Sequence, residues 1–182
     1  MEYKKIRPNT LPKRFVAIDF ETMDSWRATI CSVGIAVFEN GVMTDTYYSL
    51  VCPPSKAENY HCYKIHGLHY RDVKDSPSFS DIWPMINEKY IKDSPLVTHN
   101  TSFESSCINA YGKAYGTLTD YEYIDTLDLS REILTWLPNH TLDTTCEAVK
   151  YKLKHHHNAL EDAIACGEVY VRIKKLEGLL NE

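Results

Sequence analysis

Two acidic residues lie two positions apart in the apolar segment FVAIDFET, residues 15–22. Side chains at such spacing in a β-strand point to the same face, roughly 6.5–7 Å apart along the chain. Asp19 and Glu21 therefore share a face with Phe15 and Ala17. If this face is covered, two crowded carboxylates require a cation or a bound proton. If it is exposed, the pair is merely solvated.

A second buried acid is expected at the start of the last predicted helix, residues 158–180. Steps of three and four residues from Asp162 follow an apolar stripe. Its members are Cys166, Val169, Ile173, Leu176 and Leu180. Asp162 therefore stands at the head of the buried face. Asn158 is a good N-cap, and Glu161 three residues later completes a capping-box pattern, which gives Glu161 a structural role.

Three consecutive histidines, His155, His156 and His157, precede this helix. Within a regular helix, residues five apart lie ~140° apart around the axis. His157 can share a site with Asp162 because it lies in the loop before the cap. The histidine run can equally be an exposed tract that binds metal weakly. Because His157 lies directly before the start of the helix, it is the preferred candidate of the three for a shared site with Asp162.

The segment VTHNTSFE, residues 97–104, offers a third acid with two possible roles. Thr101 and Glu104 match the capping box, in which Glu104 would bond back to the amide of Thr101. Alternatively, Glu104 joins a metal site, which requires residues 95–100 to form a strand beside residues 14–21. We predict that Glu104 faces the metals and that Thr101 caps the helix without it.

The remaining pattern predicts an α/β fold with a mixed central sheet, flanked by helices. The sheet opens with a three-strand antiparallel meander over residues 14–21, 30–39 and 42–51, with Asn40-Gly41 as a hairpin turn. Residues 53–70 look irregular. Helices are expected at 78–91, near 102–114, at 140–151 and at 158–180, and residues 122–134 are expected to pass from a strand into a helix. Residues 1–14, with five basic residues and two prolines, read as an extended arm before one domain, residues 15–182.

Composition restricts the function classes. The chain has 182 residues, 43% of them hydrophobic, and a formal net charge of −5, which argues against a broad basic surface for long nucleic acids. The six cysteines form no C-x-x-C pair, which argues against a zinc knuckle or a redox dithiol. Since no apolar run suggests a secretory signal or a membrane span, we expect a cytoplasmic protein.

Three segments together resemble one enzyme family, the DEDD-type 3′→5′ exonucleases of the histidine subgroup (DEDDh), in particular the DNA polymerase III epsilon-subunit-like proteins. The segments are FVAIDFET, VTHNTSFE and HHHNALEDA, in the order of the family and with the His-x4-Asp spacing kept between His157 and Asp162. IHGL, VKDSPSF, YIDTLDLSR and LPNHTL are also similar. The resemblance runs from Phe15 to Tyr170 and identifies residues 15–182 as a single exonuclease domain.

The resemblance implies a ribonuclease H-like fold and a metal-dependent hydrolase that releases nucleoside 5′-monophosphates from 3′ ends. It implies that Asp19, Glu21, Asp162 and Glu104 hold two divalent cations, magnesium or manganese, and that His157 is the general base. It places four more residues around the terminal nucleotide, namely Thr22, His66, Asn100 and Phe103. Single-stranded DNA or short RNA ends suit the modest charge of the chain, and the motifs do not distinguish the two.

The sequence also departs from the family. The second motif usually ends in Asp, and here Glu104 is longer by one methylene, or ~1.5 Å. This difference affects the occupancy of the second metal and the rate of the reaction. The alternative hypothesis is therefore a non-catalytic or attenuated module that binds nucleic-acid ends or nucleotides. About 20 residues follow Asp162 and complete the last helix, so we expect no polymerase- or clamp-binding tail.

Overall fold

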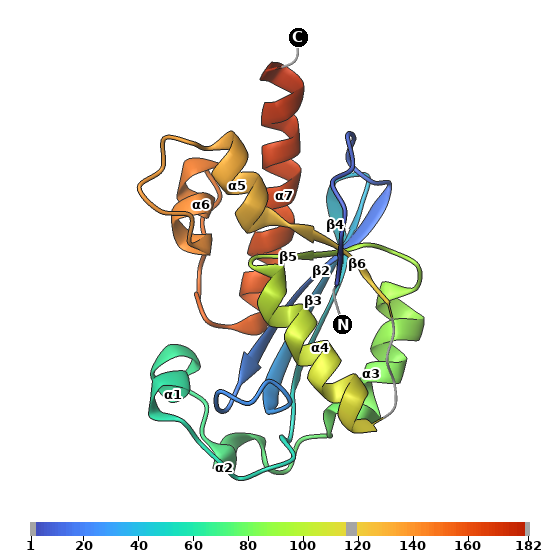
Figure 1. Cartoon of the computed structure of the whole chain (residues 1–182), viewed down its shortest axis with the longest axis vertical. Helices are drawn as coiled ribbons and strands as arrows, with labels where there is room; N and C mark the ends of the chain where they lie inside the picture. Colours follow the sequence, from blue (N-terminus) through green and yellow to red (C-terminus); the bar gives the residue numbers. More distant parts are fainter. Residues whose placement is uncertain (1–2, 116–119, 181–182) are drawn as a thin grey trace.

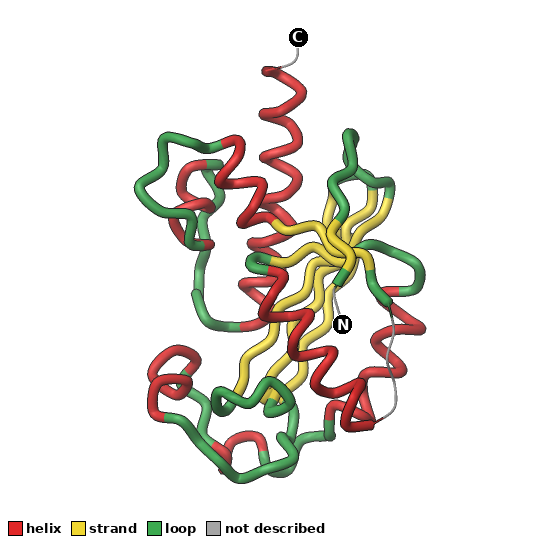
Figure 2. The backbone as a smooth tube through the Cα atoms, in the orientation of Figure 1, coloured by secondary structure: helices red, strands yellow, loops and turns green. Residues whose placement is uncertain are grey.

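The computed structural model describes residues 3–115 and 120–180 and shows a six-stranded sheet with helices on both faces (Figures 1 and 2). The strands lie in the order β1-β6-β5-β2-β3-β4. β1, β6, β5 and β2 run parallel, whereas β2, β3 and β4 form an antiparallel meander. Their bounds are Lys4–Lys5 (β1), Arg14–Thr22 (β2), Ile30–Glu39 (β3), Val42–Leu50 (β4), Leu96–Thr98 (β5) and Glu122–Asp125 (β6). The predicted mixed α/β class is confirmed.

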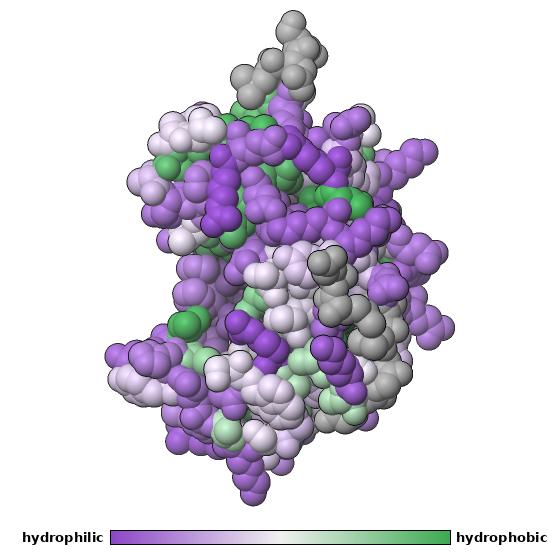
Figure 3. Space-filling model, in the orientation of Figure 1, coloured by the Kyte–Doolittle hydropathy of each residue, from purple (hydrophilic) through white to green (hydrophobic). Residues whose placement is uncertain are grey.

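Helices form a layer on each face of the sheet (Figure 1). One layer contains α3, η1 and α4, and the other contains α5, α6 and α7. Their bounds are Phe79–Ile86 (α3), Asn87–Ile91 (η1), Thr101–Tyr115 (α4), Thr126–Ile133 (α5), Leu142–Ala148 (α6) and Ala159–Leu180 (α7). Among the described helices, none is both long and apolar enough to cross a membrane. On the face shown in Figure 3, hydrophobic residues appear as small separate patches among hydrophilic ones.

The turn between β3 and β4 fixes the register of the meander. Asn40 and Gly41 have φ values of 51° and 76°. A two-residue hairpin turn of this kind needs the left-handed backbone conformation at both central positions, which Asn and Gly adopt readily. Glu39 and Val42 pair on either side of the turn. The hairpin predicted from the Asn-Gly dipeptide is confirmed.

Alternate side chains of β2 face the two helical layers. Val16, Ile18 and Phe20 lie in the core beneath α3 and α4, whereas Phe15 and Ala17 lie in the core beneath α7. The odd-numbered positions of β2 therefore face α7. The acidic pair at the end of the strand continues this row and is partly buried, so of the two alternatives the covered face is the one observed.

The amino-terminal arm supplies an edge strand. Lys4 and Lys5 form β1 beside β6, and the Ile6 amide donates to the Tyr123 carbonyl at 2.8 Å. β6 would otherwise present a row of unpaired backbone groups at the edge of the sheet. The segment expected to precede the fold therefore contributes backbone hydrogen bonds to it.

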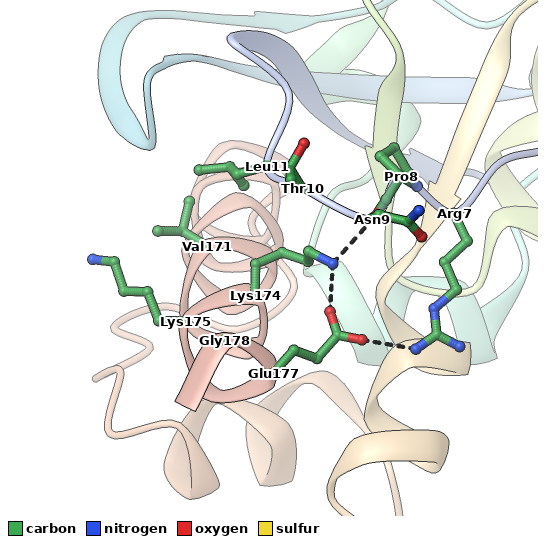
Figure 4. Close-up of a pocket in the computed structure, with 10 residues that line it drawn as sticks. All are labelled: Arg7, Pro8, Asn9, Thr10, Leu11, Val171, Lys174, Lys175, Glu177 and Gly178. Carbon is green, nitrogen blue, oxygen red and sulfur yellow. Dashed lines mark hydrogen bonds and ion pairs between the residues drawn. The ribbon is translucent and has the colours of Figure 1, made fainter. Parts of the chain in front are cut away.

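The arm then continues against the carboxyl-terminal half of α7 (Figure 4). The Lys174 ammonium donates to the Pro8 carbonyl at 3.1 Å, and the Arg7 guanidinium donates to the Glu177 carboxylate at 2.7 Å. Lys174 also pairs with Glu177. The arm is thus attached to both the sheet and the last helix.

Part of the segment expected to be irregular, residues 53–70, is helical. α1 spans Tyr60–His66, and the Asn59 side chain caps it by accepting a hydrogen bond from the first turn. Gly67, with φ 73°, ends the helix. A shorter helix, α2, follows at Tyr70–Val73. No residue of α1 is buried, so its sequence lacks the apolar periodicity from which a helix is usually predicted.

Candidate active site

Three carboxylates meet where β2 ends beneath the first turn of α7. One oxygen from each of Asp19, Glu21 and Asp162 lies within 4.8 Å of the other two. Asp162 is 4% exposed, and the other two side chains are partly buried. The structure thus brings together three of the acids that the sequence identified, from positions far apart in the chain.

A close approach between β3 and α7 positions Asp162. Gly34 of β3 is the register partner of Asp19. A Cβ atom at Gly34 would lie only 2.0 Å from the carbonyl oxygen of Ala159. Glycine is therefore required for the first turn of α7 to lie this near the sheet. Asn158 caps that turn by accepting hydrogen bonds from two amides at 3.1 and 3.2 Å, which confirms the predicted N-cap.

Burial and the neighbouring charges favour the neutral forms of Asp19 and Glu21. Burial raises the pKa of Asp19 well above its usual range, and the charges of Glu104, Glu21 and Asp162 raise it further. Burial and the charge of Asp162 raise the pKa of Glu21 to about 8. A divalent cation bound among these oxygens would relieve the repulsion and keep the acids ionised.

β5 lies beside β2 and leads directly to the start of α4. Val16 pairs with Leu96 and Ala17 pairs with Val97, in parallel. Glu104 can reach the acidic site only if β5 lies beside β2, and residue spacing alone does not establish that the two strands are neighbours. The requirement that a strand from residues 95–100 lies beside β2 is met by Leu96–Thr98.

Glu104 extends the acidic cluster from the first turn of α4. It is 2% exposed, and its Oε2 atom has no hydrogen-bond partner in the described structure. Burial raises its pKa well above the usual range. Of the three acids that raise the pKa of Asp19, Glu104 contributes most. Because an unpaired buried oxygen costs free energy, and because carboxylate oxygens suit magnesium and manganese, these residues fit a divalent-cation site.

The start of α4 is held by an acid that the sequence analysis did not select. Asp125, at the end of β6, accepts the Asn100 amide at 3.1 Å and the Thr101 amide at 3.2 Å. The Thr101 hydroxyl pairs with the Thr98 hydroxyl at 2.7 Å. Thr101 is the first residue of α4, so the prediction that Thr101 caps this helix is wrong. Since Asp125 accepts the Thr101 amide, the capping box does not hold Glu104.

Two histidines lie at the loop before α7. Nδ1 of His156 lies 3.1 Å from Oδ1 of Asp162, and the His157 amide donates to Oδ2 of Asp162 at 2.8 Å. The two imidazole rings stack with 3.8 Å between their centroids. One ring nitrogen of each lies within 4.8 Å of an Asp162 oxygen. The structure therefore adds His156, one residue before the predicted base, to the site.

The two rings have opposite pKa shifts. The hydrogen bond with Asp162 raises the pKa of His156. Burial and the neighbouring His156 lower the pKa of His157. A neutral imidazole can accept a proton, whereas an imidazolium cannot. His157 thus has the protonation state that a general base needs at neutral pH.

Four further residues predicted at the site come from separate elements around it. Nε2 of His66, the last residue of α1, lies 3.1 Å from the carbonyl oxygen of Thr22, the last residue of β2. Burial lowers the pKa of His66, and the nearby His157 lowers it further. Asn100 is exposed with φ 79°, and Phe103 is half-buried in the first turn of α4.

Sequence comparison shows which proteins this chain resembles. The family described as Exonuclease matches residues 16–170. A PolC-type DNA polymerase III from Caldanaerobacter subterraneus subsp. tengcongensis is 33% identical over 171 residues, which cover 92% of this chain and 12% of that protein. The DNA polymerase III subunit epsilon of Buchnera aphidicola subsp. Acyrthosiphon pisum is 28% identical over 172 residues, covering 87% of this chain and 72% of that subunit. The chain thus spans about 12% of the length of its PolC-type relative.

Solved structures share the fold. Exonuclease X in complex with 5′ overhanging duplex DNA aligns with a TM-score of 0.73 and 22% identity, over 90% of this chain and 93% of that one. The nuclease domain of 3′hExo, a DEDDh family member bound to rAMP, aligns with a TM-score of 0.73 and 16% identity, over 90% of this chain and 92% of that one. The expected ribonuclease H-like fold is confirmed.

Proposed function

We propose, from the premise that this chain belongs to the exonuclease family, that it is a 3′→5′ exonuclease that releases nucleoside 5′-monophosphates from single-stranded ends. One observation supports this proposal most strongly. Four carboxylates lie in one largely buried cluster next to a neutral His157, namely Asp19, Glu21, Asp162 and Glu104. A solely structural cluster of this kind would place unpaired like charges in the interior at a cost in stability. We infer that the cluster is retained for hydrolysis.

We infer that the four carboxylates hold two divalent cations, magnesium or manganese. Such ions, when bound, lower the pKa of water and neutralise charge on a phosphodiester. The protein contributes the positions of the ligands, set by the end of β2 and the first turns of α4 and α7. Glu104 is longer than the family Asp by one methylene, and its buried Oε2, which has no hydrogen-bond partner in the described structure, supports a place for it among the ligands.

The chemical step assigned to this chain is proton transfer. His157 accepts the proton of the attacking water, because burial and His156 keep the pKa of its imidazole low. The His157 amide is fixed on Asp162 by a hydrogen bond of 2.8 Å. The base is therefore attached directly to one of the proposed metal ligands, which limits its movement relative to the cluster.

The proposed substrate is the 3′ end of single-stranded DNA or of a short RNA. Thr22, His66, Asn100 and Phe103 would contact the terminal nucleotide, since they lie on the elements that border the acids. The net charge of −5 supports a site that contacts few phosphates. Structural neighbours include exonuclease I in complex with a dA16 oligonucleotide and the 3′hExo domain with rAMP, which supports both nucleic-acid types.

A labelled oligonucleotide tests this proposal. The wild-type protein with Mg²⁺ or Mn²⁺ should release labelled nucleoside monophosphate from a single strand labelled at its terminal 3′ nucleotide. Asp19→Asn should reduce the rate at least ~100-fold, whereas Asp75→Asn, whose side chain is 87% exposed, is the matched control and should act like wild type. Equal rates for wild type and Asp19→Asn would reject the site. Tight strand binding without release would favour the binding-module alternative.

A further inference from the structure

We propose that a groove beside the site binds the nucleotides that precede the 3′ end, an inference that rests on the proposed function and extends it. The groove, of about 710 Å³, is lined by residues of the loop that joins β2 to β3 and by residues of α4. Trp26 and Arg27 line it from the loop, and Asn109 and Lys113 line it from the helix. None of these residues belongs to the proposed hydrolytic site.

One end of the groove lies near that site. The loop begins directly after Thr22, the last residue of β2. The Arg27 guanidinium carbon lies 4.3 Å from the centroid of the Phe103 ring. Phe103 and Lys113 bound one side of α4, along which Ser106 and Ala110 follow at helical spacing of three and four residues. A strand whose terminal nucleotide contacts Phe103 therefore has a direct route into the groove.

The length of the groove fits a short run of nucleotides. Lys113 follows Phe103 by ten positions in the sequence, which corresponds to roughly 15 Å of helix at ~1.5 Å per residue. A stacked strand rises about 3.4 Å per nucleotide, so roughly four nucleotides span this distance. The groove therefore adds contacts for a few nucleotides only.

The chemistry of the lining suits a single strand. Trp26 is 52% exposed, and an exposed indole offers a surface on which a base of any sequence can stack. Arg27 and Lys113 supply positive charge, and the described lining residues include no acid, although the chain as a whole carries −5. The groove is thus a locally basic strip on an acidic protein, as phosphate binding requires.

Hydrogen bonds hold the loop in a fixed turn. The Trp26 amide donates to Oδ1 of Asp24 at 2.7 Å, and the Thr29 amide donates to the Trp26 carbonyl at 3.0 Å. The Thr29 hydroxyl donates to the same Asp24 oxygen at 2.9 Å. Trp26 is therefore presented by an ordered backbone, which reduces the entropy lost when a base stacks on it.

Substrates of different lengths distinguish the contribution of the groove to binding from that of the hydrolytic site. We expect kcat/KM of the wild type to rise between a dinucleotide and a hexanucleotide and then to level off. Trp26→Ala should lower the hexanucleotide-to-dinucleotide ratio of kcat/KM about 5- to 150-fold, through KM and with little change in kcat. Trp136→Ala is the matched control, because Trp136 is 68% exposed and does not line the groove. Lys113→Ala should reduce the slope of log affinity against log salt by about 1.

Fluorescence gives a readout that does not require turnover. With Ca²⁺ replacing the catalytic ions, a hexanucleotide should quench the indole emission of wild type and of Trp136→Phe, but much less that of Trp26→Phe. An equal loss of kcat/KM on both substrate lengths in Trp26→Ala, or quenching that persists in Trp26→Phe, would overturn the groove assignment. A wild type that is quenched by the hexanucleotide but never releases nucleotides would instead refute the proposed function and leave the groove assignment standing.

Discussion

The ammonium nitrogen of Lys5 lies 2.8 Å from Oδ2 of Asp125, whose carboxylate also accepts two amides at the start of α4. Although burial raises the pKa of Asp125, the hydrogen bond from Lys5 and those from the amides bring it below its usual value. One ion pair thus joins the edge strand β1 to the helix that carries Glu104. Because the family match begins at residue 16, Lys5 lies outside the matched region.

Replacing Lys5 with Met should destabilise the fold and lower activity. Asp125 would keep its buried charge without its cation. Since the Lys5 side chain is 37% exposed and water can partly replace it, we expect a loss of about 1–2 kcal/mol in the free energy of unfolding, measured by urea denaturation. Lys4→Met is the control, because Lys4 pairs with Glu122 at the surface and should change stability by less than about 0.5 kcal/mol. Equal losses in the two variants would contradict the special role of Lys5.

Replacing Glu104 with Gln should separate stability from metal binding. The change replaces a buried acid, whose ionised form is disfavoured by burial and by the neighbouring acids, with a neutral amide, so without metal we expect a gain of about 1 kcal/mol, or roughly 2–4 °C in melting temperature for a domain of this size. Titration calorimetry should show weaker Mn²⁺ binding at the same time. Glu104→Asp keeps the carboxylate and should bind Mn²⁺ at least ~10-fold more tightly than Glu104→Gln. A Gln variant with wild-type Mn²⁺ affinity would remove Glu104 from the ligand set.

Replacing His157 with Ala should lower kcat about 10²- to 10⁴-fold with little change in KM, as expected for loss of a general base. The control is His155→Ala, since His155 is not among the residues grouped around Asp162. In the wild type, kcat should fall on the acidic side with a midpoint below 6.5, because burial and His156 lower the pKa of His157 and only the neutral ring accepts a proton. If the fall in kcat at acidic pH is unchanged in His157→Ala, the group that titrates there is not His157.

The carboxylate cluster predicts that metal-free stability depends on pH. The pKa of Glu21 rises from 4.5 to about 8 in the folded protein, and that of Asp19 also rises. A raised pKa in the folded state contributes stability that is complete below the unfolded pKa and is lost as pH rises through the folded pKa. The melting temperature in a chelator should therefore fall between pH 5 and pH 9, and Mn²⁺ should restore it most at high pH. Asp19→Asn should flatten the profile, and a chelator profile that rises over this range would contradict the explanation.

Much of the fold and of the acidic cluster could be predicted because the relevant signals are local. Asn40-Gly41 determines a hairpin by backbone conformation alone, and strand alternation places Asp19 and Glu21 on the face shared with Phe15. Asn158 likewise caps α7 as its residue type predicts. Each of these inferences depends on residues within a few positions of one another.

The remaining features depend on contacts between distant segments. Thr101 and Glu104 match a capping box, yet the Thr101 amide donates to Asp125, at the end of β6, and not to Glu104. The available signal for Asp125 was an acid directly after the apolar residues Tyr123 and Ile124, because a buried carboxylate needs donors. The helix at Tyr60–His66 has no buried residue, so only its capping residues indicated it. His156 was overlooked because spacing alone does not show which of two adjacent rings reaches Asp162.

The packing of the first turn of α7 against Gly34 also determines when the proposed active site is complete. A chain emerging from the ribosome has Asp19, Glu21 and Glu104 long before it has Asp162, which comes from the last helix. Until that helix docks, the ligand set is incomplete and the histidine next to it is absent from the site. Contacts between such distant segments are among the slower ones to form. An unfinished chain therefore lacks part of the ligand set of the proposed nuclease.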